Sequence, residues 1–135
     1  MRRNIQQIRA DFALSKVSTL VSDNTPQVQR RFKAYSNGLP AMVQTNGIGQ
    51  ALAFAFQKSN GNGDEARAWK LLFNLISEWL LQRGIWGNTK GSLLERLSRG
   101  NQEQYQLAQA ELQALLAWVK DFSRALIKGE IEQGD

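Results

Sequence analysis

Apolar residues along the chain recur at helical spacing, and the strict apolar–polar alternation of half-buried strands is almost absent. Residues 4–21 carry Ile5, Ile8 and Phe12 on one stripe, which predicts an amphipathic helix. A second helix is expected to start at Thr25-Pro26. Threonine caps free backbone N–H groups, and proline at the first helical position loses no needed hydrogen bond.

The segment Asn37-Gly38-Leu39-Pro40 predicts the end of this second helix. Proline disfavours helical geometry at the residue before it, and Gly38 permits a positive φ. We expect a separate short helix from Pro40 to about Gln44. Gly47 then predicts a left-handed stop, followed at once by a new helix through Lys58.

This new helix has one side made of very small residues, which predicts a close contact with another helix. The residues on that side are Gly49, Ala51, Ala53 and Ala55.

The second half of the chain has the clearest signals for loops and helix ends. Residues 59–63 predict a loop, and the next helix, to about Arg83, has a wide apolar stripe typical of a central core helix. Ser92 opens a capping box with Glu95 for a short helix that ends at Gly100. Asn101 caps the longest helix, whose apolar seam predicts antiparallel packing against a neighbour. The seam consists of Tyr105, Ala108, Leu112, Leu115, Val119, Phe122 and Leu126.

These elements predict an all-α fold, a compact single-domain bundle of about six helices over residues 1–135, with the last few residues flexible. The chain has 135 residues, which suffices for one core and is too short for two. It contains no His and no Cys, which excludes imidazole bases, thiolate nucleophiles, disulfides and the usual zinc and iron–sulfur sites. The basic start of the chain precedes no apolar run of signal or membrane length, so we expect a soluble cytoplasmic protein with no membrane partner.

Positive charge is concentrated in the first half of the chain. Residues 1–63 hold eight basic and two acidic residues, whereas residues 64–135 hold nine basic and ten acidic ones, for a net charge of +5. Such a split suggests a surface that meets polyanions. Charge alone favours this interpretation no more than an ordinary solvated face.

Three features of the sequence could indicate a chemical function, but each lacks residues that the function needs. Gly47-Ile48-Gly49 begins like a dinucleotide fingerprint but lacks the third glycine and a preceding strand. Residues 60–71 resemble a calcium loop but have Glu65 where glycine is needed and Leu71 in place of the final glutamate. The carboxylates lie on predicted helix termini or polar faces and converge on no site. We therefore expect no enzymatic activity and no metal or cofactor.

Trp86 stands apart from the other three tryptophans, because it lies between glycines in a predicted turn. Its ring is expected either to dock on a partner or stack on a nucleic-acid base, or to fold back over the core. The densest basic cluster is Arg30, Arg31 and Lys33, with Tyr35 nearby. Arg30 and Lys33 share a helical face, which permits phosphate contacts without implying base readout.

Residues 34–54 carry a specific pattern: Tyr35, then Leu-Pro-x-Met with Pro40 and Met42, then Thr-Asn-Gly-Ile-Gly-Gln leading into Leu-Ala-Phe. This pattern resembles the small subunit of the type III-B CRISPR effector, the Cmr complex, in which Ile48 is more often leucine. The motif residues, which we interpret as structural, are Tyr35, Pro40, Met42, Asn46, Gly47, Gly49 and Gln50.

The resemblance implies a non-catalytic, all-helical subunit in antiviral defence. Copies of such subunits stack head to tail and line the groove where guide RNA pairs with target RNA, and the chemistry belongs to other Cmr subunits. The implied partners are thus other Cmr subunits, further copies of the chain, and guide and target RNA. Our hypothesis for RNA-backbone contact rests on the charge split and names Arg30, Arg31, Lys33 and Lys58 first, then Arg2, Arg3, Arg9 and Lys16.

The competing interpretation is a helical adaptor with a purely protein partner and no nucleic-acid role. It would use Trp86 and the exposed part of the 105–126 seam, and its positive charge would be incidental. Salt dependence separates the two, because binding to an RNA backbone weakens steeply as salt rises and apolar docking does not.

Overall fold

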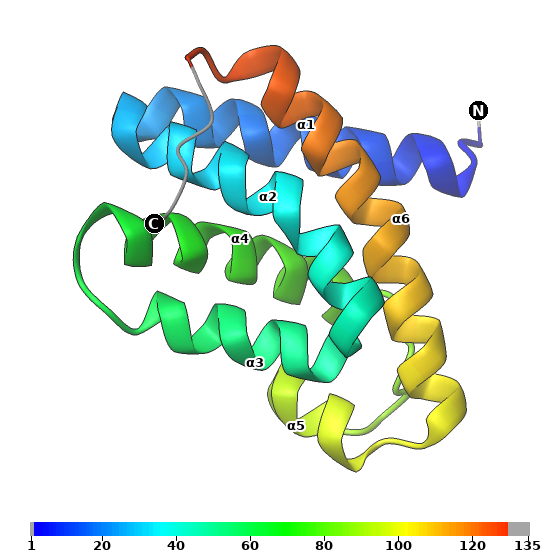
Figure 1. Ribbon diagram of the computed structural model, residues 1–135. Helices are drawn as coiled ribbons and strands as arrows, with labels where there is room; N and C mark the ends of the chain where they lie inside the picture. Colours follow the sequence, from blue (N-terminus) through cyan, green and yellow to red (C-terminus); the bar gives the residue numbers. More distant parts are fainter. Residues whose placement is uncertain (1, 130–135) are drawn as a thin grey trace.

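Six helices make up the chain in the computed structural model, which describes residues 2–129 (Figure 1). In chain order they are α1 (Ile5–Asp23), α2 (Pro26–Asn46), α3 (Ile48–Ser59), α4 (Gly63–Leu81), α5 (Leu93–Arg99) and α6 (Gln102–Leu126). No strand occurs among these residues, so the predicted all-α bundle is confirmed. The expected flexibility of the last few residues concerns positions that lie outside the described range.

Polar side chains fix most helix starts where the sequence predicted them. Asn4, Thr25, Ser92 and Asn101 each accept a hydrogen bond from a backbone N–H in the first turn of the helix that follows. Each bond satisfies a donor that has no partner inside its own helix. The predicted capping box of Ser92 with Glu95 is present.

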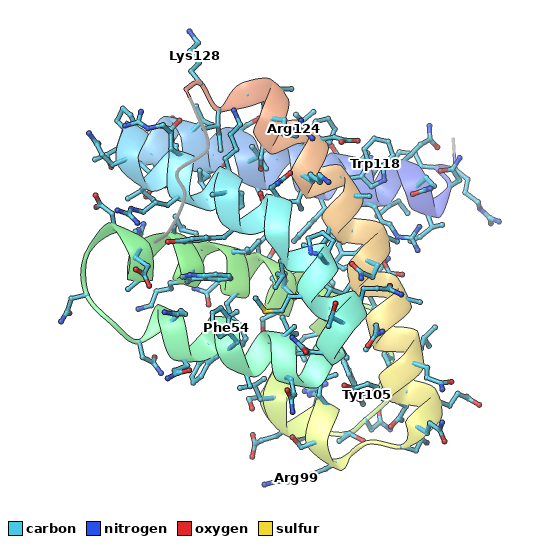
Figure 2. All side chains as sticks on the ribbon, in the orientation of Figure 1. Phe54, Arg99, Tyr105, Trp118, Arg124 and Lys128 are labelled. Atoms are coloured by element: carbon cyan, nitrogen blue, oxygen red, sulfur yellow. The ribbon has the colours of Figure 1, made fainter. Side chains whose placement is uncertain are left out.

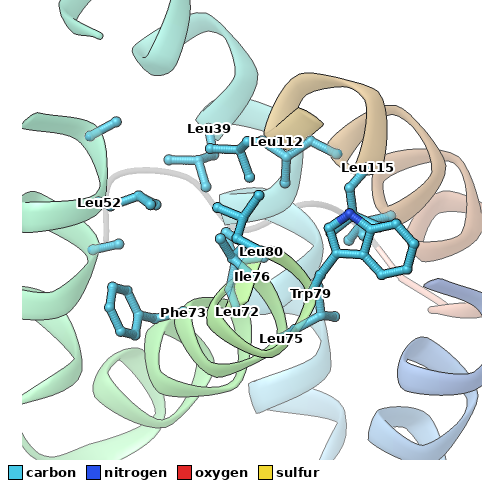
Figure 3. Packing of buried hydrophobic residues seen from close by; sticks show 14 of the residues in the cluster. Leu39, Leu52, Leu72, Phe73, Leu75, Ile76, Trp79, Leu80, Leu112 and Leu115 are labelled. Atoms are coloured by element: carbon cyan, nitrogen blue, oxygen red, sulfur yellow. The ribbon is translucent and has the colours of Figure 1, made fainter. Parts of the chain in front are cut away.

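α4 is the central helix of the core. Its apolar stripe contacts α2 and α3, and Leu72, Ile76, Trp79 and Leu80 are almost completely buried (Figure 3). α6 crosses the bundle along one side, packing on α1 near one end and reaching α5 at the other (Figure 1). The bundle therefore has one continuous core.

α6 lies antiparallel to α2, as its seam predicted. Gln113 Nε2 donates to the Pro40 carbonyl at 2.9 Å, and the hydroxyls of Ser123 and Ser36 lie 3.5 Å apart, so residue numbers fall along α2 as they rise along α6. The middle of the seam is fully buried, whereas Leu126 at its end is 37% exposed.

The predicted break at residues 37–40 is wrong, and so is the separate short helix from Pro40. α2 runs through Pro40 without interruption, and Gly38 has no positive φ. Leu39 and Val43, on either side of Pro40, are 1% and 0% exposed in the α2 contact with α4 and α6. Burial of these side chains outweighs the one backbone hydrogen bond that proline removes.

The small-residue side of α3 is confirmed only in part. Ala51 and Ala55 are fully buried and lie one turn apart, which allows the close contact of α3 with α4. Ala53 is exposed. It lies two residues from each, and two residues correspond to about 200° of helical rotation, so it points to the other side.

Gly38→Ala is expected to raise the free energy of unfolding by about 0.5–1 kcal/mol, because alanine loses less conformational freedom than glycine in a helix interior. A Cβ at Gly38 would meet nothing within 4 Å, so no clash offsets this gain. Urea unfolding followed by circular dichroism measures the change. A loss of stability would contradict the continuous helix.

Candidate nucleic-acid interface

The start of α3 is held by two side chains of α6. The backbone N–H of Ile48 donates to Gln109 Oε1, and that of Gly49 donates to Tyr105 Oη, both at 2.9 Å. Gly47, which precedes α3, has no side chain with which to cap these groups. Two backbone donors at the helix start are thus satisfied by a helix more than fifty residues away in the sequence.

Both glycines of the motif lie close against Tyr105. Gly47 has φ 85°, which disfavours any L side chain, and a Cβ there would lie 2.9 Å from Tyr105 Oη. A Cβ at Gly49 would lie 3.2 Å from the same oxygen. The predicted stop at Gly47 is confirmed in φ, whereas its ψ of 158° is extended rather than left-handed helical.

The remaining motif residues fall into two groups. Tyr35 stacks on Trp69 with ring centroids 4.3 Å apart, Met42 packs against the core, and the Pro40 carbonyl accepts from Gln113. These three contacts support the structural interpretation of the motif. Asn46 and Gln50 are exposed, and nothing in the structure explains them.

The first-choice cations for RNA contact are less available than their sequence suggested. Arg30 and Arg31 are half-buried on α2. Lys33 Nζ donates to the carbonyls of Ile127 and Gly129, at 3.0 and 3.1 Å.

Lys58 Nζ, the fourth of these cations, lies 3.4 Å from Glu65 Oε1 and 5.5 Å from the centroid of the Phe54 ring. Of the four, Lys33 and Lys58 therefore already bind groups of the protein itself.

Three of the four second-choice cations make ion pairs within the protein, and the fourth, Arg2, is exposed and makes none with the other residues of the range 2–129. The pairs are Arg3 with Asp11 at 3.1 Å, Arg9 with Glu111 at 2.8 Å, and Lys16 with Glu78 at 2.8 Å. RNA contact by any of the eight residues stays a prediction.

The Arg9–Glu111 pair lies at the meeting point of α1, α4 and α6. Arg9 Nε and Nη2 donate to the two carboxylate oxygens at 2.8 and 2.9 Å, and Trp79 Nε1 donates to Oε2 at 2.8 Å. The side chains of Arg9 and Glu111 are 15% and 14% exposed. The Arg83 guanidinium lies 4.4 Å from the Trp79 ring centroid and covers its face.

Burial alone would raise the pKa of Glu111. Hydrogen bonds from Arg9 and Trp79, and the positive charges of Arg9 and Arg83, outweigh burial and hold the pKa of this carboxyl below its usual range. The hydrogen bond from Glu111 likewise raises the pKa of Arg9, against the effect of burial. The group is thus a buried ion pair whose hydrogen bonds are satisfied, and we assign it no chemical step.

The Trp86 ring is folded over the core, the second of the two outcomes expected for it. It is 2% exposed, and its Nε1 has no hydrogen-bond partner among the residues that the structure describes. The ring therefore offers no docking surface in this conformation.

The carboxylates of the described residues do not gather around a possible metal. Within residues 2–129, no three His, Cys, Asp or Glu side chains come together in a way that could hold a metal ion. In the same range, no helix is long and apolar enough to cross a membrane.

Residues 5–126 match the family model described as CRISPR-associated protein (Cas_Cmr5). The match runs from the first residue of α1 to the last residue of α6. The chain belongs to the Cas_Cmr5 family. This confirms the resemblance to the small subunit of the type III-B Cmr complex that the motif around Gly47 indicated.

Membership of the Cas_Cmr5 family makes the chain a CRISPR-associated subunit that associates with other Cmr subunits. The sequence does not single out Lys120, Arg124 and Lys128, because acidic residues cancel them in the net charge of the second half. Their spacing of four residues, one helical turn, is the signal that could have drawn attention to them.

Glu111→Gln is expected to lower the free energy of unfolding by about 3 kcal/mol, because it leaves the Arg9 guanidinium buried without a countercharge. Glu78→Gln is the matched control. It breaks the more exposed Lys16–Glu78 pair, with side chains 37% and 53% exposed, and should cost less than about 1 kcal/mol. Equal losses in the two variants, measured by urea unfolding, would contradict the buried pair.

Glu111→Gln is also expected to change how the stability of the folded protein depends on pH. Because the pKa of Glu111 is lowered in the folded state, the folded protein binds fewer protons than the unfolded chain, so stability rises with pH. The contribution is complete above the unfolded pKa of about 4.3 and is lost as pH falls through the folded value. Melting temperatures measured from neutral pH downward should fall less steeply below about pH 5 in Glu111→Gln than in the wild type.

Gly47→Ala is expected to lower the free energy of unfolding by at least about 2 kcal/mol, since it combines an unfavourable φ with a clash against Tyr105. Gly38→Ala, expected to stabilise, is the control for replacing a glycine in the same region. If the motif is structural, the folded fraction of Gly47→Ala should retain the RNA affinity of the wild type. A loss of RNA affinity with unchanged stability would show instead that the motif contacts RNA.

Proposed function

We propose that this chain is a non-catalytic small subunit of the type III-B CRISPR effector that stacks along the complex and lines the groove where guide and target RNA pair. The observation that carries the proposal is the Cas_Cmr5 match across all six helices. The net charge of +5 supports it, because a basic surface attracts an RNA backbone. In this role the protein acts in the cytoplasm in antiviral defence.

The non-catalytic part of the proposal is supported by what the acidic side chains do. Glu111 is paired with Arg9 in the core, and Glu95 is occupied by the capping box of α5 and by Arg99 at 3.1 Å. Hydrogen bonds from Ser92, with the charge of Arg99, lower the pKa of Glu95. Both carboxylates are thereby engaged in hydrogen bonds and ion pairs that hold the helices in place.

The adaptor interpretation has lost Trp86, and of the 105–126 seam it keeps the end, where Leu126 is 37% exposed. The Trp86 ring is buried, and the middle of the 105–126 seam packs inside the bundle. The large apolar side chains that remain exposed are spread over α1, α3 and α6, and include Leu14, Phe56 and Leu107. Single exposed apolar residues are normal on soluble proteins and need no partner.

Affinity purification of the tagged chain from its native host, at physiological salt, tests the proposal. We expect to recover other Cmr subunits together with short RNAs that share a repeat-derived 5′ end. Mass spectrometry and RNA sequencing of the eluate identify both. Recovery of the chain alone, or with one unrelated protein and no RNA, would overturn the proposed function.

A further inference from the structure

Three cations in the last turns of α6 and just beyond its end have no carboxylate partner among residues 2–129, unlike Arg3, Arg9, Lys16 and Lys58 of the first half. Lys120, Arg124 and Lys128 make no ion pair and no hydrogen bond with any other described residue. Arg124 and Lys128 are exposed, and Lys120 is half-buried. Figure 2 shows Lys128 extending away from the molecule just past the end of α6.

Two hollows bring these cations together with α2. Lys120 and Arg124 line one of about 350 Å³, beside Pro40 and Gln113. Lys128 lines a second of about 410 Å³, which it shares with Arg30. Among residues 2–129, Asp121 is the one acidic residue that lines either hollow, so within this range the lining cations outnumber the lining carboxylates.

The backbone that carries Lys128 is fixed in place. Lys33 Nζ binds the carbonyls of Ile127 and Gly129, the residues on either side of Lys128, and the Ile127 side chain is 2% exposed. Gly129 packs so closely on Arg30 that a Cβ there would lie 2.8 Å from Arg30 Cδ. An anchored cation loses less freedom on binding than one on a loose chain end.

We propose that Lys120, Arg124 and Lys128 form a phosphate-binding stripe that receives the RNA backbone, with Arg30 beside it. This inference rests on the proposed function and names the part of the chain that meets the RNA. Lys120 and Arg124 are one turn apart, about 6 Å along the axis. That distance spans about two phosphates of one strand, which follow each other every ~3.4 Å along a duplex axis. Lys33, which the sequence placed among the phosphate contacts, holds the turn that presents Lys128.

These cations have a simpler structural use, which the test must separate from RNA binding. Positive side chains near a helix C-terminus interact favourably with the helix dipole. A purely structural role would change the melting temperature of a variant and leave the salt dependence of RNA binding as it is.

The test compares two charge-reversed full-length variants in the purified complex. The stripe variant is Lys120→Glu/Arg124→Glu/Lys128→Glu, and the matched control is Arg67→Glu/Lys70→Glu/Lys90→Glu. The control residues are exposed and lie outside the stripe. Each reversal replaces a positive charge by a negative one and lowers the net charge by two, so three reversals take it from +5 to −1 in both variants. Target RNA affinity is measured between about 50 and 200 mM salt, the range over which phosphate contacts weaken steeply.

We expect the stripe variant alone to lose affinity. Three lost phosphate contacts should make the plot of log affinity against log salt shallower by about 2, at about 0.7 per contact for a single strand. Near 0.1 M salt this corresponds to roughly 100-fold weaker binding. The control variant should keep the slope of the wild type. Both variants carry the full sequence, including Glu130, Glu132 and Asp135, which lie outside the described residues.

Three results would overturn the stripe. Unchanged affinity and slope in the stripe variant would show that these cations face away from RNA. Equal losses in the two variants would indicate a general effect of net charge. Failure of only the stripe variant to join the complex would show that the cations meet an acidic protein surface. Failure of the wild-type chain to recover Cmr subunits and RNA would instead reject the proposed function.

Discussion

The contact between α6 and the start of α3 is the constraint on which much of the fold depends. Tyr105 and Gln109 supply the hydrogen bonds that a glycine cap cannot, and the close approach of Tyr105 leaves no room for a side chain at Gly47. The chain can therefore turn from α2 into α3 with a single residue between them. That tight turn places the small face of α3 against α4, where Ala51 and Ala55 are fully buried.

A second contact of α6 ties the two ends of the chain to the centre. Glu111 accepts hydrogen bonds from Arg9 of α1 and from Trp79 of α4, while the seam of α6 covers the core. A buried ion pair adds little net stability compared with apolar packing, but breaking it is costly, so it favours one arrangement of the helices over others. In this bundle it fixes where α1 lies on α6 and leaves Arg9 unavailable for a ligand.

Local signals in the sequence are sufficient to predict where most helices start. They are insufficient to predict features that depend on packing between residues far apart in the sequence. Helix starts could be predicted at Thr25, Ser92 and Asn101, because a cap acts within one turn of its own residue. Pro40 misleads for the opposite reason. Its local preference is to end a helix, and the burial of Leu39 and Val43 against α4 and α6 decides the outcome. The sequence predicts that Gly47 ends a helix. It does not predict that Tyr105, 58 residues further on, occupies the space of a side chain at this position.

The same limit applies to charge. Ion pairs between residues far apart in the sequence change the distribution of unpaired charge that a count over each half of the chain suggests. Lys16 and Glu78 are 62 residues apart in sequence, and Arg9 and Glu111 are 102 apart, yet each pair is in contact. A cation beside a carboxylate forms a dipole, whose field falls with distance faster than that of a single charge. Over a Debye length of about 8 Å, the unpaired cations therefore dominate the potential that an approaching polyanion meets. In the described part of the chain, Arg9, Lys16 and Lys58 of the first half pair with carboxylates of the second half, so unpaired positive charge is less concentrated in the first half than the sequence suggests.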